Sequence, residues 1–299
     1  MDELKIGMIG LDTSHASAFA KLLNDPANPN HVRGGKVVIA CPAGSLDFEL
    51  SSSRIGKITR EVESYGVRMA ATIEEVAEQS DCILVESVDG RSHLEQVRRL
   101  AGFKKPIFVD KPLCLSSADA VAIAELSERY QTPIMSTSAL RFAEPLRKAL
   151  AIKDRGEIIG ADCFGPMDMV DTQPGYFWYG IHTIEMLYAI LGAGVRHVRA
   201  DSTRDSDLIA AQWEDGRIGT ARGNRNGSYA FGAVIHFEKG NEFVIIDSSS
   251  KPFYASLLEE IILFFRGTHA AVRLDETREI IRFIEAANES RETGKKVSL

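Results

Sequence analysis

The chain has 299 residues, of which 44% are hydrophobic and 26% are charged, and its formal net charge is −7. This composition is typical of a soluble globular protein, and the length exceeds what a single hydrophobic core usually supports, so two domains are expected. The negative charge and the lack of a dense Lys/Arg cluster argue against nucleic acid as a partner. No apolar run approaches the ~20 residues of a membrane helix, which argues against a membrane partner.

The N-terminus and the cysteines indicate a cytoplasmic protein. The opening MDELKIGMIGLD has no basic region before its apolar stretch, so it is expected to be a first strand and not a secretion signal. Cys41, Cys82, Cys114 and Cys163 are far apart and form no CxxC pair. Reduced thiols are therefore expected, and a structural zinc site is not.

Short apolar runs alternate with helical patterns over the first 140 residues. The expected strands are 5–9, 37–41, 82–85, 107–109 and a last one that begins at 133–135. The expected helices are 14–23, 46–65, 73–78, 92–100 and 118–130. This alternation indicates βαβ units, and it predicts a doubly wound parallel sheet of the Rossmann type.

The second half of the chain has consecutive strands separated by tight turns. The expected strands are 157–164, 196–201, 208–213, 218–223, 233–237 and 243–246, and the expected helices are 179–191, 252–265 and 275–290. Asp215-Gly216 and Lys239-Gly240-Asn241 fall where hairpin turns are needed. The pattern predicts an α/β domain with a largely antiparallel open sheet, and it divides the chain into domains 1–138 and 139–299.

The turn after the first strand is the first candidate ligand site, because doubly wound sheets bind ligands beyond the carboxyl ends of their strands. Gly10 can make the sharp exit from the strand, and Thr13 or Ser14 can cap the next helix. The helix N-terminus would then favour a bound phosphate. However, Asp12 and His15 stand where the second and third glycines of G-x-G-x-x-G belong. A simple helix cap and a phosphate site both remain open, and His15 is expected to be a packing or capping residue.

The end of the second strand also departs from the dinucleotide-binding pattern. It reads Cys41-Pro42-Ala43-Gly44-Ser45, with no acidic residue before Asp47 to hold the adenosine ribose. Ser45 or Arg54 could accept a phosphorylated ribose, which favours NADP over NAD. An ordinary turn is the alternative.

The expected strand 107–109 ends in the segment Phe108-Val109-Asp110-Lys111-Pro112-Leu113. This segment resembles the Glu-Lys-Pro motif of the Gfo/Idh/MocA oxidoreductases, with Asp110 in place of Glu. In the family this lysine lies between the nicotinamide and the substrate, and a cis bond often precedes the proline. Ser87 to His93 resembles the loop after the fourth strand, and Arg141-Phe142 with Pro145 resembles an Arg-Tyr/Phe-x-x-Pro segment.

The resemblance extends from residue 4 to residue 297. The stretch 180–185 is similar to the family's Gly-x-His-x-x-Asp helix, and 275–297 resembles its C-terminal helix and tail. It implies NAD or NADP as cofactor. The residues that it places at the cofactor are Gly10, Asp12, Thr13, Ser14, Ser87, His93, Lys111 and Pro112. The family often has an aspartate four residues before the helix histidine, where this chain has Trp178.

Two of these residues are candidate catalytic groups. His182 could act as general acid or base, because an imidazole titrates near neutral pH, and Lys111 could stabilise negative charge on the reacting oxygen. The candidate substrate ligands are Arg141, Trp178, Tyr179 and Glu185. Glu185 could instead orient His182, Arg141 could form an interdomain salt bridge, and Trp178 could close the site. No metal site is expected, because the histidines and acids show no ligand spacing.

The leading hypothesis is an NAD(P)-dependent oxidoreductase that acts on a sugar, polyol or related hydroxy compound. The alternative is a non-catalytic ligand-binding or regulatory protein on the same fold, as Asp12, Pro42 and Trp178 suggest. A third class is a lyase or hydrolase that holds a nicotinamide tightly for internal redox. A small-molecule substrate is expected, and a homodimer or homotetramer is expected to form through the C-terminal sheet, with apolar positions exposed on strands such as 231–237.

Overall fold

The computed structural model describes residues 2–299 and divides into two compact units. The first unit holds residues 2–114, Ala118–Thr137 and Tyr254–Leu274, and the second holds Leu115–Ser117, Ser138–Phe253 and Asp275–Leu299. The first unit therefore includes a late segment of the chain, which the sequence-based division at 138 assigns to the second domain.

The late segment joins the first unit through helix α9 (Phe253–Phe265). The ring of Tyr254 lies 4.8 Å from the ring of His15 and 5.8 Å from that of Phe19. After the helix, the Arg266 side chain donates to the carbonyl of Gly34 at 2.8 Å. Hydropathy patterns predict the helix, but they do not show which unit its apolar face will cover.

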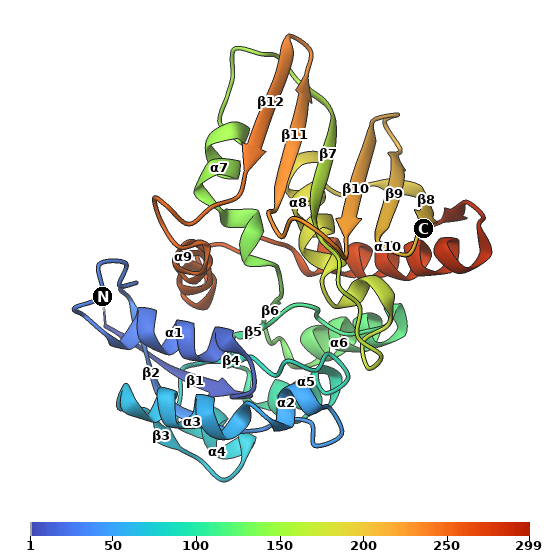
Figure 1. Ribbon diagram of the computed structural model, residues 1–299. Coiled ribbons are helices and arrows are strands. Elements are labelled where there is room, and N and C mark those ends of the chain that lie inside the picture. The colour runs from blue at the N-terminus through green and yellow to red at the C-terminus, as the bar shows by residue number, and fades with distance from the viewer. Residues whose placement is uncertain (1) are drawn as a thin grey trace. The chain divides into compact units, whose positions relative to one another are not determined.

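A parallel sheet with strand order β3-β2-β1-β4-β5-β6 forms the centre of the first unit (Figure 1). Its strands are β1 (Leu4–Ile9), β2 (Gly35–Cys41), β3 (Arg68–Met69), β4 (Cys82–Val85), β5 (Ile107–Val109) and β6 (Ile134–Met135). Every pair of neighbours is parallel. The predicted doubly wound Rossmann sheet is confirmed, and only the two-residue β3 was not expected.

Helices cover this sheet, whose strands β4 and β5 are buried along their whole length. They are α1 (Ser14–Asn24), α2 (Glu49–Ser52), α3 (Ile55–Ser64), α4 (Ile73–Glu78), α5 (His93–Leu100) and α6 (Ser117–Tyr130). The single helix expected over 46–65 is broken into α2 and α3. The break follows the serine run 51–53, whose side chains compete with backbone hydrogen bonds and disfavour a continuous helix.

The second unit contains a sheet with strand order β12-β11-β7-β10-β9-β8-β13. Its strands are β7 (Ile158–Pro166), β8 (Val195–Ser202), β9 (Ser206–Trp213), β10 (Ile218–Asn224), β11 (Gly232–Phe237), β12 (Gly240–Ile245) and β13 (Val297–Ser298). The β10–β7 pair is parallel and the other pairs are antiparallel. The prediction of a largely antiparallel sheet is confirmed.

Helices lie against one face of this second sheet, and the other face is open (Figure 1). Helix α8 (Gly180–Leu191) contacts β7 and β10, and α10 (Leu274–Thr293) runs beside it. Helix α7 (Glu144–Leu150), which begins with a proline in its first turn, was not expected from the sequence. Apart from two short 3-10 helices, α7 and the two-residue β13, the elements of the second half follow the expected order. Helix α8 ends at Leu191, before Gly192, whose φ is +74°.

Apolar side chains are exposed on the open face of the second sheet. Phe243 is 63% exposed and Ile218 is 59% exposed. By contrast, Ile235 and Phe237 of β11 are buried. Further exposed apolar side chains come from β7, β9 and β12, namely Ile159, Leu208 and Ile245.

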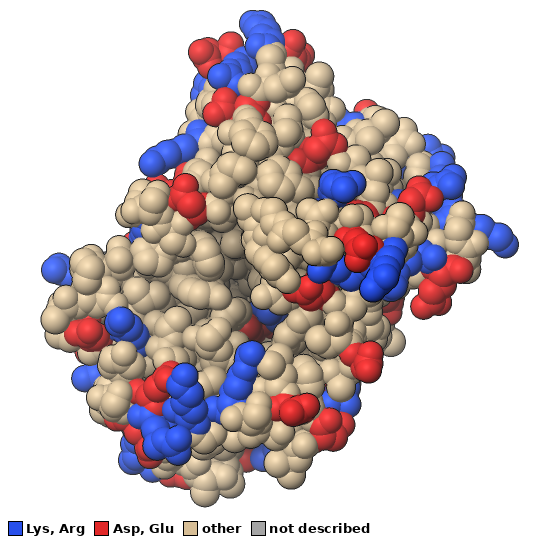
Figure 2. Space-filling view, viewed as in Figure 1, with Lys and Arg blue, Asp and Glu red and all other residues tan. Residues whose placement is uncertain are grey.

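Across residues 2–299, we find no helix that combines the length and the apolar character needed to cross a membrane. Acidic and basic side chains are interspersed over much of the face shown in Figure 2.

Candidate functional site

The β1–α1 turn is a tight glycine turn that leads into a capped helix. Gly10 has a φ of +88°, and a Cβ at this position would lie 2.3 Å from the backbone nitrogen of Ser87, so the position requires glycine. Thr13 caps α1, because its hydroxyl accepts a hydrogen bond from the backbone N–H of His15 at 3.4 Å. The turn thus delivers the N-terminus of an eleven-residue helix to the carboxyl edge of the sheet, where backbone N–H groups favour an anion.

Asp12 connects the β1–α1 turn to two other segments of the first unit by hydrogen bonds. Its carboxylate is fully buried and accepts hydrogen bonds from the Ser51 hydroxyl at 2.6 Å and from the Val88 backbone N–H at 3.0 Å. Burial raises the pKa of Asp12, and these two bonds act against that rise. A Cβ on Gly44 would lie 3.2 Å from the same carboxylate. The protein interior therefore accommodates the bulk and charge that Asp12 brings to the glycine loop.

Ser87 and His93 connect the β4–α5 loop to the segment after β5. His93 is fully buried, with Nε2 at 2.8 Å from the carbonyl oxygen of Ser87 and Nδ1 at 2.9 Å from that of Pro112. The Ser87 hydroxyl accepts a hydrogen bond from the Gln96 side chain at 2.7 Å. The structure thus brings together three of the residues that the sequence places at a cofactor: Ser87, His93 and Pro112.

The Asp110-Lys111-Pro112 segment follows β5, and its Lys111–Pro112 peptide bond is cis. Asp110 is buried and pairs with the imidazole of His15, with Nδ1 and Oδ2 2.7 Å apart. Burial raises the pKa of Asp110, but the interactions with His15 and with Lys111 outweigh burial and hold it at about 2. His15, expected to be a packing or capping residue, is thus a hydrogen-bond partner of Asp110 at the strand edge.

Glu86, which directly follows β4, is buried beside these groups. Its side chain has no exposed surface, and within residues 2–299 neither carboxylate oxygen has a hydrogen-bond partner. Burial raises the pKa of Glu86 well above its usual range, the neighbouring Asp110 raises it further, and the charge of Lys111 acts against this rise. The sequence analysis did not single out Glu86; its position directly after a strand of the parallel sheet is the signal that could have found it.

In the second unit, aromatic rings surround His182. Its Nδ1 lies 2.7 Å from the hydroxyl oxygen of Ser138, and its ring lies edge to face with Tyr179 and with Phe231, each at 5.7 Å between centroids. The Trp178 ring is 6.2 Å from that of Tyr179. The structure thus groups three predicted site residues, His182, Tyr179 and Trp178, and adds Ser138 and Phe231, which sequence spacing did not indicate.

Arg141 and Glu185, two predicted substrate ligands, form a buried ion pair. The Arg141 Nε donates to Glu185 at 2.8 Å, and its Nη2 donates to Glu276 at 2.6 Å. Burial lowers the pKa of Arg141, but the two carboxylates outweigh burial and raise it. All three residues belong to the second unit, so this is an ion pair within one unit and not the interdomain salt bridge that was one interpretation of the sequence.

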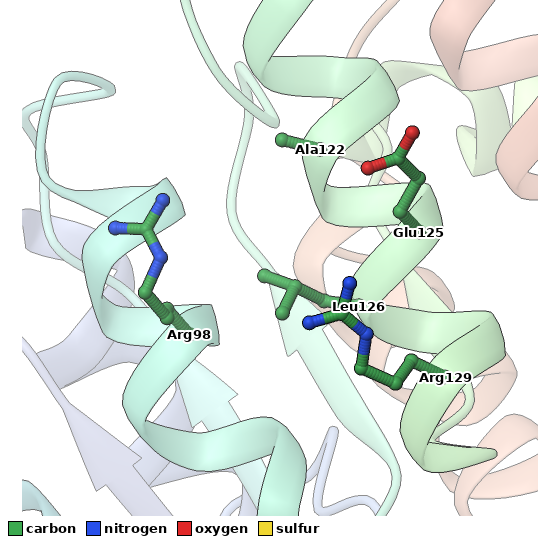
Figure 3. A pocket seen from close by; sticks show the side chains of 5 residues that line it. All are labelled: Arg98, Ala122, Glu125, Leu126 and Arg129. Atoms are coloured by element: carbon green, nitrogen blue, oxygen red, sulfur yellow. The ribbon is translucent and has the colours of Figure 1, made fainter.

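Two cavities lie on the helices of the first unit. A cavity of about 400 Å³ between α1 and α3 is lined by Ser14, Ser17, Ala18, Lys21, Arg54, Lys57, Ile58 and Glu61. Figure 2 shows basic side chains gathered over α3. A smaller cavity of about 170 Å³ lies between α5 and α6, where Figure 3 shows Arg98 on one helix and Leu126 and Arg129 on the other.

The strand order β3-β2-β1-β4-β5-β6, with a glycine turn at the first strand–helix junction, defines the first unit as a dinucleotide-binding Rossmann domain. Residues 4–138 match the Gfo/Idh/MocA family, which is described as an oxidoreductase family with an NAD-binding Rossmann fold. The match covers this domain alone, and over residues 4–138 the resemblance noted in the sequence is confirmed.

Solved structures share the fold over nearly the whole chain. A myo-inositol dehydrogenase from Lactobacillus casei, in complex with NAD(H) and myo-inositol, is 15% identical with a TM-score of 0.78, covering 100% of this chain and 97% of its own. A scyllo-inositol dehydrogenase from the same organism is 16% identical with a TM-score of 0.79, covering 99% and 98%. An oxidoreductase from Agrobacterium radiobacter, in complex with NAD+, L-tartaric acid and magnesium, is 18% identical with a TM-score of 0.75, covering 99% and 98%. A search of curated protein sequences gave no match.

Proposed function

We propose that this protein is an NAD(P)-dependent oxidoreductase that moves hydride to or from a sugar, a polyol or a related hydroxy compound. The observation that carries the proposal is the Asp110-Lys111-Pro112 segment at the end of β5, in a domain that matches the oxidoreductase family. Structural relatives that act on inositols support the polyol class.

The β1–α1 turn fits the phosphates of a dinucleotide. Gly10 leaves room for close approach, and the start of α1 at Thr13 and Ser14 offers backbone N–H groups to negative charge. The Asp12 carboxylate does not conflict with this role, because it is buried and hydrogen-bonded to Ser51 and Val88. When bound, the nicotinamide supplies the hydride acceptor or donor.

Lys111 and His182 have separate chemical roles in the proposal. Lys111 donates a hydrogen bond to the reacting oxygen and stabilises the negative charge that develops there. His182 removes or returns the hydroxyl proton. Ser138 holds the imidazole through Nδ1, so we expect Nε2 to carry the transferred proton.

The remaining predicted substrate ligands divide into two groups. Tyr179 and Trp178 lie beside His182 and are partly exposed, so a hydroxyl group and two ring faces are available to a polyol. Arg141 and Glu185 are buried and paired, and we propose that they fix α8 to the segment before α7 instead of touching the substrate.

Binding and hydride transfer test this function directly. We expect calorimetry to detect binding of NAD or NADP. With a panel of sugars and polyols, we expect a change in the absorbance of the reduced nicotinamide. His182→Ala should lower kcat by about 10²- to 10⁴-fold, the usual contribution of a general acid or base. Lys111→Ala should also lower kcat, whereas His197→Ala on the outer strand β8 serves as the matched control. If neither dinucleotide binds at millimolar concentration, the proposal fails.

Trp178 favours a second candidate, a ligand-binding or regulatory protein on the same fold. Trp178 stands four residues before His182, at the position where the family often has an aspartate. In this case a dinucleotide or sugar would bind with no turnover of any compound in the panel. Hydride transfer that depends on Lys111 would reject this candidate.

The cavity between α1 and α3 supports NADP over NAD. Lys21, Arg54 and Lys57 line it together with one acid, Glu61, and this excess of positive charge suits the additional phosphate of NADP. We expect Arg54→Ala to weaken NADP binding while NAD binding stays the same. Arg60→Ala, on the same helix but outside the cavity lining, is the control. Equal loss for both dinucleotides would contradict the assignment.

We also propose that the chain forms a homodimer or homotetramer through the open face of the second sheet. The exposed side chains of Phe243 and Ile218 support this association. Light scattering should show a multiple of the 32.8 kDa chain, and Phe243→Ser should shift the distribution toward monomer. A wild-type protein that is monomeric at all concentrations would refute it.

A further inference from the structure

We propose that His15, Glu86 and Asp110 bind a divalent first-row transition-metal ion at the carboxyl edge of the parallel sheet. One ligand atom from each side chain lies within 4.8 Å of the others. All three residues belong to the first unit, and the sequence analysis expected no metal there.

The strand order brings these residues together. Glu86 directly follows β4 and Asp110 directly follows β5, and β4 pairs in parallel with β1 on one side and β5 on the other. His15 lies in the first turn of α1, which follows β1. Three neighbouring strands therefore end at the same edge, and each contributes one side chain through its following segment.

Glu86 is the observation that points to a ligand. It has no exposed surface, and neither of its oxygens has a hydrogen-bond partner within residues 2–299. A buried carboxyl group without a partner is costly, and nearly all such groups in proteins are hydrogen-bonded, paired or bound to a metal. A second carboxylate, Asp110, is buried beside it, so a divalent cation would neutralise two acids at once.

The donor set indicates the kind of ion. One imidazole nitrogen and two carboxylate oxygens suit Zn²⁺ or Mn²⁺, whereas Mg²⁺ prefers oxygen ligands alone. Three protein ligands also leave positions open, as in catalytic metal sites. Metal–ligand bonds of about 2.0–2.2 Å keep ligand atoms about 3.0–3.5 Å apart, so the present spread within 4.8 Å requires only side-chain adjustment.

His15 gives the site both a path to solvent and an oriented ligand. Its side chain is 12% exposed, whereas that of Asp110 is 4% exposed, so an ion can enter on the histidine side. The Tyr254 ring lies 4.8 Å from the imidazole and Phe19 lies 6.1 Å away on the same helix. This packing limits ring rotation while Nδ1 faces Asp110 at 2.7 Å.

Metal binding can be measured on the full chain without any nucleotide. After treatment with a chelator, titration with MnCl₂ and with ZnCl₂ should show one site per chain, and the bound ion should raise the melting temperature. Glu86→Gln keeps the shape of the side chain but removes its charge, and it should weaken binding by more than about tenfold. His236→Gln is the matched control, because His236 also pairs with a carboxylate, Asp162, at 2.7 Å, but no third His, Cys, Asp or Glu within residues 2–299 joins them.

A spectroscopic measurement separates a ligand from a residue that only supports the fold. Bound Mn²⁺ should show nitrogen coupling in electron paramagnetic resonance, and this coupling should disappear in His15→Gln. His15 is partly exposed, so this variant provides the test if Glu86→Gln does not fold. The inference is overturned if the wild-type chain binds neither ion, or if both variants bind as the wild type does.

The result is independent of the proposed oxidoreductase function. Dinucleotide binding without metal binding would leave that function in place and remove this site. Metal binding without dinucleotide binding would support this site and contradict the proposed oxidoreductase function.

Discussion

The two units bury charged side chains in opposite ways. In the second unit, the Arg141 guanidinium lies against the carboxylates of Glu185 and Glu276, at 2.8 and 2.6 Å. In the first unit, Glu86 is as deeply buried as Glu185, yet its oxygens have no hydrogen-bond partner in the described chain, residues 2–299. The same residue type therefore serves two purposes: a paired carboxylate holds elements together, and an unpaired one is available to a ligand.

The difference matters because burial of a charge is costly in both places. An ion pair with good geometry compensates for lost hydration, and removing one partner leaves the other uncompensated. An unpaired carboxyl group has no such compensation and must hold a proton or a cation. The same substitution at the two glutamates should therefore change stability in opposite directions.

The largest change in stability is expected when Glu185 is substituted. Glu185→Met leaves the buried Arg141 with only the partly exposed Glu276, so the free energy of unfolding should fall by about 3–5 kcal/mol. Urea denaturation followed by circular dichroism measures the loss. The double variant Arg141→Met/Glu185→Met should recover part of it, and a single variant as stable as wild type would contradict the comparison.

A smaller effect of opposite sign is expected at Glu86. In the presence of a chelator, Glu86→Met removes an unsatisfied buried carboxyl group and should raise the free energy of unfolding by about 1–3 kcal/mol. The same urea experiment measures it, with Glu185→Met as the matched substitution. Destabilisation of the metal-free protein would show that Glu86 is a structural residue.

The smallest effect is expected where the charged pair is exposed. His236 pairs with Asp162 at 2.7 Å, and this hydrogen bond raises the pKa of His236, although partial burial acts against it. Because the folded pKa is raised above the unfolded value, the stabilisation is present below the unfolded pKa and disappears as the pH rises through the folded one. Solvent reaches both side chains, so we expect less than about 1 kcal/mol.

A pH series measures that last effect. The difference in unfolding free energy between wild type and Asp162→Asn should be positive near pH about 5.5 and should vanish near pH about 8.5, on either side of the ordinary histidine pKa. A difference that grows with pH would contradict the assigned sign. His15 and Asp110 are also 2.7 Å apart, but their side chains are largely buried. The two His–Asp pairs therefore have the same length and differ in their exposure to solvent.

Local patterns were sufficient for most elements and for part of the site. The predicted first and last residues of β4 and β5 are those of the structure. Lys111-Pro112 after β5 was identified from the motif alone. The two-residue β3 and the helix α7 were missed, since short elements carry too little periodicity. The contact between Ser138 and His182 was missed because these residues are 44 positions apart.

The amino-acid sequence by itself determined the order of most strands and helices, the Rossmann sheet and the match of residues 4–138 to the oxidoreductase family, because hydrophobic period and motif spacing are local properties of the chain. The tertiary structure decided which charges are paired. Whether Arg141 meets Glu185, or Glu86 is buried beside Asp110 and His15, depends on how distant segments pack. Burial and partnership of a charge are set by three-dimensional neighbours, and residue type alone does not contain them.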